Sequence, residues 1–256
     1  MCLILLAYDC HPRYKLVVAA NRDEYYSRPT QSARFWPENP AILAGKDLIK
    51  DGTWTGITTT GRFAAVTVYR EVSTYPAHLP SRGLLAANYL ASHEAPEVYM
   101  ERLVNESADY KGYSLLAGTF DALFYLSNRE NKVRKLDKGL HGLSNNLLDV
   151  PWPKVTKGIK SLAVCLQEEE IEVEHLFAIM ADRERPDDRD LPDTGVGLEM
   201  ERMLGSACIV SPNYGTRATT IILVDRNNKV EFWERSLVSG ASDPWQEVHY
   251  QAQVDS

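Results

Sequence analysis

Residues 2–24 read CLILLAYDCHPRYKLVVAANRDE and give the strongest indication of the architecture. Two apolar runs, Cys2–Tyr8 and Tyr14–Ala20, flank a turn-forming stretch that contains Pro12. This pattern is typical of a β-hairpin with both strands buried. The polar cluster Asn21–Glu24 follows at once, so we expect it to lie where the second strand leaves the core. In a hairpin that point lies beside the start of the first strand.

The rest of the chain alternates between blocks of strands and blocks of helices. Further strands are predicted at residues 62–69, 113–117, 123–126, 132–136, 207–210, 219–224 and 230–233. Helices are predicted from Ser81 through Leu90, from Pro96 through Leu103, from Pro153 to about Gln167 and from Ile171 to Met180. Loops are expected around Pro29, Pro37 and Pro40 and over 182–193. This order favours an α+β fold with two sheets between helix layers over a doubly wound parallel sheet.

Composition restricts the class of protein. The chain has 256 residues, of which 44% are hydrophobic and 25% charged, as in soluble globular proteins, and we expect a single domain over 1–256. The net charge of −7 argues against nucleic acid as a partner. The apolar start Leu3–Ala7 is far shorter than the roughly 20 residues of a membrane span. We therefore expect no integral membrane segment and a cytoplasmic location, with Cys2, Cys10, Cys165 and Cys208 as reduced thiols.

Cys2 differs from the other cysteines because removal of Met1 would leave a thiol and a free α-amine on one residue. The α-amine titrates near about pH 8, so it can accept the proton of the thiol. A nucleophile of this kind needs no separate base. The alternative is that Cys2 is a small buried hydrophobic residue that opens a strand.

Arg22 and Asp23 are expected to lie beside Cys2 through the hairpin. Arg22 would favour the thiolate or hold a substrate carboxylate, and Asp23 would accept hydrogen bonds from the terminal ammonium. The alternative is an ordinary surface ion pair at a strand end.

Two later segments carry polar groups in patterns that packing does not require. Asn145 and Asn146 follow His141–Ser144, and Arg217 ends Tyr214-Gly215-Thr216-Arg217. An Asn amide can donate to an oxyanion, and an Arg fork suits a carboxylate. Alternatively, the two asparagines build a turn and Arg217 closes a surface ion pair.

Metal and cofactor signals are weak. The six histidines show no close pairing with the spacing of a zinc site, and no glycine-rich phosphate loop follows a strand. The sequence Cys10-His11-Pro12 offers sulfur or imidazole to haem iron, but it also fits a simple turn. We expect no metal and no resident cofactor.

Several motifs, taken in chain order, resemble one known family. They are Met1-Cys2, Asn21-Arg22-Asp23-Glu24, Gly52-Thr53-Trp54, Ser81-Arg82-Gly83, Gly142-Leu143-Ser144-Asn145, Pro151-Trp152-Pro153-Lys154 and Tyr214-Gly215-Thr216-Arg217. They are similar to the NRDE family, also called the transport and Golgi organisation protein 2 family. The resemblance implies a four-layer αββα sandwich of the N-terminal nucleophile hydrolase type, related in plan to choloylglycine hydrolase and penicillin V acylase.

The resemblance also implies catalytic roles. Those hydrolases use an N-terminal Cys, an Arg and an Asp at the end of the second strand, a mid-chain Asn and a later Arg. The matching positions here are Cys2, Arg22, Asp23, Asn145 and Arg217.

The chain departs from the pattern at two places. Arg22 and Asp23 are adjacent, whereas the hydrolases separate these two residues, so in a continuing strand they would point to opposite faces. The family favours Thr-Asn-Tyr-Arg where this chain has Thr67-Val68-Tyr69-Arg70, and an Asn at position 68 would be a natural second oxyanion donor.

Two functions fit these residues. In the first, the protein is a cysteine N-terminal nucleophile hydrolase that cleaves a non-peptide C–N (amide) bond in a small molecule. In the second, it is a non-catalytic carrier of a hydrophobic ligand. For that carrier the resemblance points to haem trafficking, with acyl lipid or acyl-CoA next. In either case Asn21, Trp54 and Asn146 are expected to contact the ligand, with Trp54 lining the apolar part.

Overall fold

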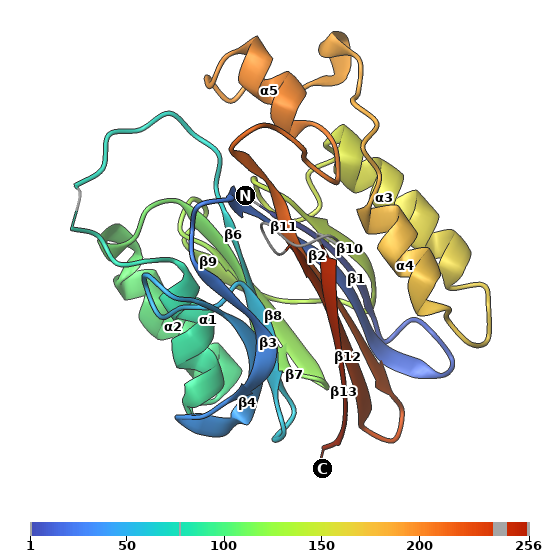
Figure 1. Cartoon of the computed structure of the whole chain (residues 1–256). Coiled ribbons are helices and arrows are strands. Elements are labelled where there is room, and N and C mark those ends of the chain that lie inside the picture. Colours follow the sequence, from blue (N-terminus) through green and yellow to red (C-terminus); the bar gives the residue numbers. More distant parts are fainter. Residues whose placement is uncertain (1, 77, 238–244, 255–256) are drawn as a thin grey trace.

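The N-terminal hairpin forms as the sequence predicts (Figure 1). The computed structural model describes residues 2–76, 78–237 and 245–254, and of Cys2 it describes the backbone. Strands β1 (Cys2–Tyr8) and β2 (Tyr14–Tyr25) are antiparallel, with Cys2 opposite Arg22 and Tyr8 opposite Leu16. His11 closes the turn, because its Nδ1 accepts hydrogen bonds from the N–H groups of Arg13 and Tyr14, each at 3.2 Å.

The hairpin belongs to the first of two antiparallel sheets. In the described residues its strand order is β10-β1-β2-β11-β12-β13. The added strands are β10 (Gly139–Leu143), β11 (Tyr214–Asp225), β12 (Lys229–Leu237) and β13 (Trp245–Gln253). The second sheet runs from β3 to β9 in chain order. Its strands are β3 (Thr30–Trp36), β4 (Asn39–Asp47), β5 (Thr55–Thr58), β6 (Arg62–Val68), β7 (Tyr113–Thr119), β8 (Ala122–Ser127) and β9 (Lys132–Lys135).

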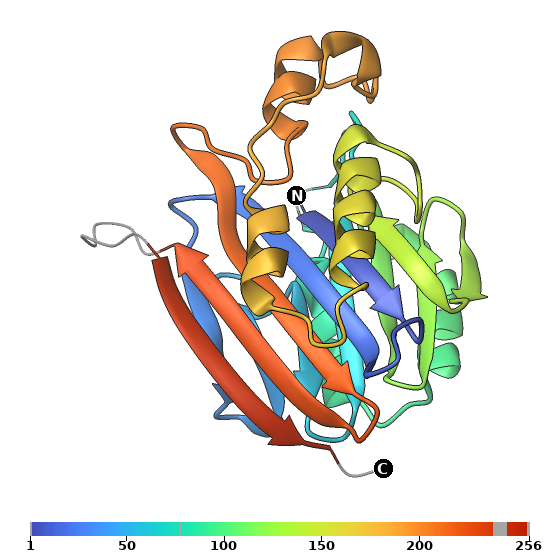
Figure 2. The same ribbon diagram turned by 90° about the vertical axis from the view of Figure 1, so that its right-hand side faces the viewer.

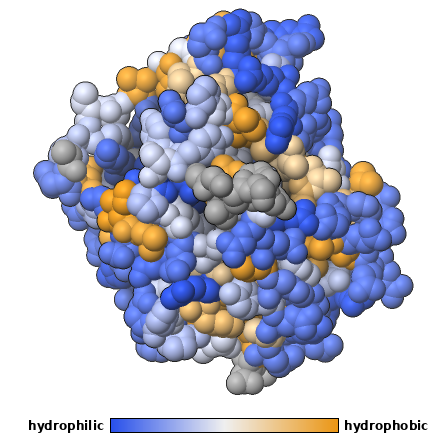
Figure 3. All heavy atoms as spheres, viewed as in Figure 1, coloured by the Kyte–Doolittle hydropathy of each residue, from blue (hydrophilic) through white to orange (hydrophobic). Residues whose placement is uncertain are grey.

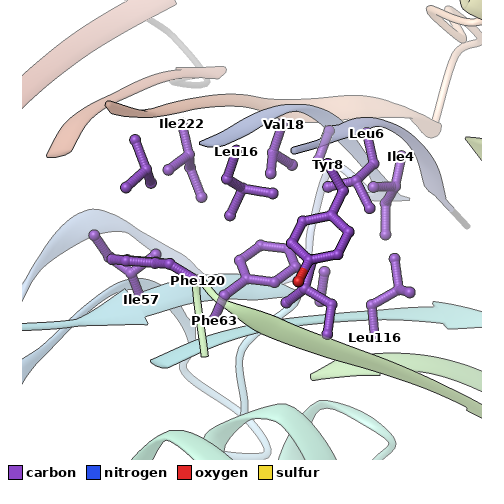
Figure 4. Close-up of a cluster of buried hydrophobic side chains, with 14 of the residues drawn as sticks. Ile4, Leu6, Tyr8, Leu16, Val18, Ile57, Phe63, Leu116, Phe120 and Ile222 are labelled. Carbon is purple, nitrogen blue, oxygen red and sulfur yellow. The ribbon is translucent and has the colours of Figure 1, made fainter. Parts of the chain in front are cut away.

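The two sheets pack face to face through one apolar cluster (Figure 4). Side chains alternate along a strand, and in the hairpin the even-numbered residues Leu6, Leu16 and Val18 face the second sheet. They meet Phe63 and Leu116 there, and all five are almost completely buried. Burial of each such side chain contributes about 1.5–3 kcal/mol, so this layer contributes substantially to stability.

Helices cover both outer faces (Figures 1 and 2). The second sheet is covered by α1 (Gly83–Ala91) and α2 (Pro96–Asn105), and the first by α3 (Pro153–Cys165) and α4 (Val173–Met180). This arrangement confirms the predicted four-layer αββα sandwich. A shorter helix, α5 (Leu198–Leu204), lies beyond α3 near the start of β1 (Figure 2). Single 3₁₀ turns occur at Ser107–Asp109 and Asp188–Asp190.

The main difference from the sequence prediction concerns β2. The strand does not end at Ala20 but continues through the polar cluster to Tyr25. Asn21, Arg22 and Asp23 are only 1%, 5% and 2% exposed, so the alternative of a surface ion pair at a strand end is wrong. The physical reason is that β11 pairs with β2 as far as Tyr214 opposite Tyr25, which extends the sheet over this segment.

Other elements also differ. The loops expected around Pro29, Pro37 and Pro40 include strands β3 and β4, because the prolines fall before β3, in the turn and near the start of β4. Strands β5, β10 and β13 and helix α5 were not predicted either. The strand expected at 207–210 is reduced to one bridge between Val210 and Gly215. Among the described residues no helix combines the length and the apolar character needed to cross a bilayer.

Candidate functional site

The polar end of β2 presents its side chains to two different layers. Arg22 lies on the face that carries Val18 and Ala20, toward the second sheet, whereas Asn21 and Asp23 lie on the opposite face. The structure therefore separates Arg22 and Asp23 in the way their adjacency predicts. The backbone of Cys2 pairs with Arg22, so the first residue of β1 lies beside both groups. The side chain of Cys2 lies outside the described residues.

Arg22 is the buried cation of the site. Its Nη1 donates to Thr30 Oγ1 at 3.1 Å and its Nη2 donates to Asp47 Oδ2 at 3.2 Å. The guanidinium carbon lies 4.5 Å from the centre of the Trp54 ring, a cation–π contact. Asp47 also accepts two hydrogen bonds from Arg28. Burial raises the pKa of Asp47, but the hydrogen bonds from Arg28 and from backbone N–H groups outweigh burial, so its net pKa is lowered.

Asp23 is the buried carboxyl of the site. Its Oδ1 accepts a hydrogen bond from Thr216 Oγ1 at 2.6 Å. Burial raises the pKa of Asp23, and this effect exceeds the lowering by Lys154, Thr216 and Arg70. Lys154 is itself only 5% exposed, and its Nζ donates to the Leu204 carbonyl at 3.0 Å. A buried carboxyl with cations nearby can hold a second ammonium group in place.

Asn145 joins the two sheets at the same end of the molecule. It is fully buried in the loop that follows β10. Its Nδ2 donates to the Val68 carbonyl at 3.0 Å, and its own carbonyl accepts the N–H of Arg70 at 2.8 Å. The amide is thus fixed at the end of β6, and its role as an oxyanion donor stays a prediction.

Asn146 lies next to Asn145 and is half-buried. Its Oδ1 accepts the N–H of Leu147 at 2.7 Å, and its carbonyl accepts the hydroxyl of Ser114 at 3.0 Å. These bonds shape the loop that carries Asn145. A ligand contact by Asn146 stays a prediction.

Asn21 is tied to the scaffold. Its Nδ2 donates to the carbonyls of Met180 and Ala207, and its Oδ1 accepts the hydroxyl of Thr219. These bonds fasten the end of α4 to the first sheet. The ligand contact expected of Asn21 stays a prediction.

Arg217 is tied to the scaffold in the same way. Its Nη1 donates to the carbonyls of Tyr25, Tyr26 and Arg28. The residue sits at a register irregularity of β11, between Thr216 and Ala218, which turns its side chain toward the loop after β2. Burial lowers the pKa of Arg217, and the neighbouring Arg22 lowers it further. A direct catalytic role for Arg217 stays a prediction.

A cavity of about 160 Å³ lies between Arg22 and the start of α1. Its lining includes Arg22, Asp23, Trp54, Thr67 and Gly83. Among the residues that the structure describes, Trp54 Nε1 and Thr67 Oγ1 are buried without a hydrogen-bond partner. Buried polar atoms are nearly always satisfied, so these two are available to a bound molecule. Trp54 thus lies on the wall of the cavity beside Arg22, and the ligand contact expected of it stays a prediction.

Sequence reasoning missed the polar groups that surround these residues. They are Asp47, Arg70, Lys154, Glu201 and Thr216. Lys154 and Thr216 belong to motifs that resemble the family, and Arg70 belongs to the segment that departs from it. Their positions in these segments could have identified them as candidates. Glu201 had no such signal, because it lies in a charged segment that reads as a surface helix or loop.

Within the described ranges, no group of three or more His, Cys, Asp or Glu side chains is arranged to hold a metal ion. At the turn after β1, both ring nitrogens of His11 have hydrogen-bond partners: Nδ1 bonds the turn and Nε2 lies 2.9 Å from the Glu168 carbonyl. Cys10 is exposed beside it. His11 therefore serves the turn, as the alternative of a simple turn at Cys10-His11-Pro12 predicts.

Comparison with known proteins gives close relatives over the full length. The family model described as Transport and Golgi organisation 2 matches residues 1–239. The Homo sapiens transport and Golgi organization protein 2 homolog is 33% identical over 277 residues, and the Bos taurus homolog is 32% identical over 281. Both alignments cover 100% of this chain and of the relative. The Drosophila melanogaster protein is 28% identical and covers 97% of each chain.

Solved structures share the fold at low identity. The mutant C2A conjugated bile acid hydrolase from Clostridium perfringens matches with a TM-score of 0.56 at 10% identity, covering 98% of this chain and 92% of that chain. Penicillin V acylase from Agrobacterium tumefaciens matches with a TM-score of 0.50 at 11% identity, covering 93% and 84%. These likenesses concern the fold alone, and they confirm the predicted N-terminal nucleophile hydrolase type.

Proposed function

The chain belongs to the transport and Golgi organisation 2 family, and we propose that it hydrolyses a non-peptide amide or related acyl bond of a small molecule, with Cys2 as the nucleophile. One observation carries the proposal: the backbone of Cys2 pairs with Arg22 at the buried polar end of β2. Directly opposed residues of an antiparallel pair have Cβ atoms only about 4.5–5.5 Å apart. A nucleophile, a buried cation, a buried carboxyl and a small cavity thus gather at one strand end.

The chemistry begins once Met1 has been removed. The α-amine of Cys2 takes the proton of the thiol, and the thiolate attacks the substrate carbonyl carbon. The carbonyl oxygen becomes an oxyanion. When the C–N bond breaks, the ammonium gives its proton to the leaving amine, and a thioester to Cys2 remains. Water, deprotonated by the same amine, then hydrolyses the thioester and restores the thiol.

The surrounding residues have distinct parts in this scheme. Arg22 favours the thiolate through its charge. Asp23 accepts hydrogen bonds from the α-ammonium and keeps it beside the thiol. Asn145 has two N–H groups on Nδ2, of which one donates to Val68, and the other is the donor that we assign to the oxyanion. Position 68 carries a valine side chain with no N–H, so Asn145 acts there without a second side-chain donor.

The carrier alternative needs more space than the cavity at Arg22 provides, and a larger cavity of about 570 Å³ lies beside Lys154, between α3 and α4. Pockets that hold drug-sized ligands have volumes of about 300–1,000 Å³, whereas the cavity at Arg22 has about 160 Å³. A spectral titration with haem tests this alternative. Haem binding that saturates near one equivalent per chain, with an affinity that Arg22→Met lowers, would favour the carrier over the hydrolase.

The test of the proposal starts from the intact mass of protein purified from its native cell. We expect the mass to lack Met1. The purified protein is then mixed with p-nitrophenyl acetate. We expect a burst of about one p-nitrophenolate per chain, because each acylated thiol releases one.

The matched variants are Cys2→Ala, which should abolish the burst, and Cys10→Ser, which removes an exposed thiol of the same hairpin and should leave it unchanged. Conjugated bile acids and penicillin V serve as the first amide substrates. Retention of Met1 in the native protein, or an unchanged burst in Cys2→Ala, would overturn the proposal.

A further inference from the structure

A buried ion pair connects the candidate site to helix α5. Arg70, two residues after β6, donates through Nη1 to Glu201 Oε2 on α5. The two side chains are only 2% and 4% exposed. The guanidinium of Arg70 also lies 4.7 Å from the centre of the Trp152 ring. The pair is therefore buried from solvent, and it lies at the end of the sheets where β1 begins.

Arg70 is also the residue that fixes Asn145. Its backbone N–H donates to the Asn145 carbonyl at 2.8 Å, and its Nη2 lies 3.5 Å from Asn145 Oδ1, at the long end of the range for a hydrogen bond. A cation beside Oδ1 determines which way round the amide lies. The oxygen faces Arg70, and Nδ2 faces the Val68 carbonyl at the end of β6.

Glu201 in turn fixes α5 over this end of the molecule. Its Oε1 accepts the backbone N–H of Thr194 at 3.0 Å and also the hydroxyl of Thr194. At the other end of α5 the Leu204 carbonyl accepts Lys154 Nζ. Two buried cations from different layers, Arg70 and Lys154, thus reach the same short helix, which lies beyond the N-terminal end of β1 (Figure 2).

Stability alone gives little reason for such a pair. Removing two charges from water costs several kcal/mol, and an apolar pair of similar volume is often as stable. We propose that Glu201 is a positioning residue that acts through Arg70 to hold the Asn145 amide with its N–H toward the oxyanion. This inference rests on the proposed function, because it assigns α5 to the same site.

The test compares two reagents that react with the same thiol in a Cys10→Ser background. Acylation by p-nitrophenyl acetate passes through an oxyanion, whereas alkylation by iodoacetamide does not. We expect Glu201→Gln to slow acylation of Cys2 at least tenfold and to change alkylation less than twofold. Asn145→Ala should slow acylation further, and Glu201→Gln should add nothing in the Asn145→Ala background.

The matched control is Glu199→Gln, which removes a carboxylate from the same helix whose side chain is 86% exposed and pairs with Arg202. It should leave both rates unchanged. If Glu201→Gln does not fold, the double variant Arg70→Met/Glu201→Leu replaces the pair with apolar groups and should fold with the same selective loss of acylation. Equal losses with both reagents, or none, would overturn the inference.

A second readout separates this inference from the proposed function. The side-chain amide of Asn145 gives its own pair of NMR signals, which report its orientation whether or not Cys2 is acylated. We expect Glu201→Gln to shift these signals and to speed their hydrogen exchange at least tenfold, with Glu199→Gln as the control. If wild-type Cys2 is not acylated but the signals move, the proposed function fails and the positioning of Asn145 stands. If acylation is normal and the signals do not move, the positioning fails.

Discussion

The two halves of β2 differ in character although they form one continuous strand. From Leu16 to Ala20 both faces are apolar, one packed against the second sheet and the other against α3 and α4. From Asn21 to Asp23 the strand is just as buried, but each side chain is polar. There, each is held by a partner distant in sequence, such as Met180 for Asn21 and Thr216 for Asp23.

This difference separates the two tasks of the strand. The apolar half removes hydrophobic surface from water and so stabilises the fold. The polar half needs its hydrogen bonds only to offset the cost of burying polar and charged groups. What it provides is geometry: it sets Arg22 and Asp23 on opposite faces beside the first residue of β1. Variants in the two halves should therefore affect different observables.

The largest loss of stability is expected where the apolar half of β2 packs against the second sheet. Phe63→Ala removes a fully buried ring that packs against this half of β2, and it should lower the free energy of unfolding by about 3–5 kcal/mol because of lost burial and the cavity left behind. Urea unfolding measures the loss. Alkylation of Cys2 in the folded fraction should stay within twofold of wild type. Tyr25→Ala, at an aromatic ring that is 59% exposed, is the control and should cost little. A strong change in alkylation with Phe63→Ala would break the separation of tasks.

A smaller loss of stability and a clear change in reactivity are expected in the polar half. Arg22→Met leaves Asp47 with Arg28 as its partner, so the free energy of unfolding should fall by only about 1–3 kcal/mol. The rate of Cys2 alkylation by iodoacetamide at pH 7 should fall up to about tenfold, since a nearby cation favours the thiolate by roughly one pKa unit. Arg22→Lys keeps the charge and should retain most of the rate. An unchanged rate in Arg22→Met would mean that the register of β1 and β2 does not bring this cation to the thiol.

The same contrast explains which parts of the fold the sequence could predict. The apolar half of the hairpin has the continuous apolar run and the length of a strand buried on both faces, so its position and its partner were both predicted. Strand β13 was not, because its residues are mostly half-buried or exposed at a sheet edge and lack a continuous apolar run. Helix α5 was missed because it lies in a charged segment and is held by Glu201 and Leu204, through contacts distant in sequence.

The site was predictable as a set of residues but not as a network. Motif resemblance named Arg22, Asp23 and Asn145, and the structure brings all three to the strand end where Cys2 lies. Local sequence suggested that the polar cluster leaves the core, because charged residues after an apolar run are usually solvated. Their burial depends on β11 and on the second sheet, which no pattern within residues 14–25 could reveal.

The smallest expected effect concerns the loop that carries Asn145 and sharpens the contrast through pH. His141 Nδ1 lies 2.8 Å from Asp149 Oδ2, and Asp149 Oδ1 accepts the N–H of Gly142 at 2.8 Å. The hydrogen bond to Asp149 raises the pKa of His141, and this outweighs the lowering by burial. A raised folded-state pKa means that the protonated pair adds its full stability below the unfolded pKa of about 6.5, and that this contribution is lost as pH rises through the folded value.

The contribution of this pair should be below about 1 kcal/mol, because the Asp149 side chain is 47% exposed. Urea unfolding of His141→Gln from pH 5 to pH 9 should show a deficit against wild type that shrinks as pH rises. The same series with His93→Gln, at an exposed position, should show no such trend. A deficit that grows with pH would mean that the neutral imidazole, and not the imidazolium, holds this loop beside the polar half of β2.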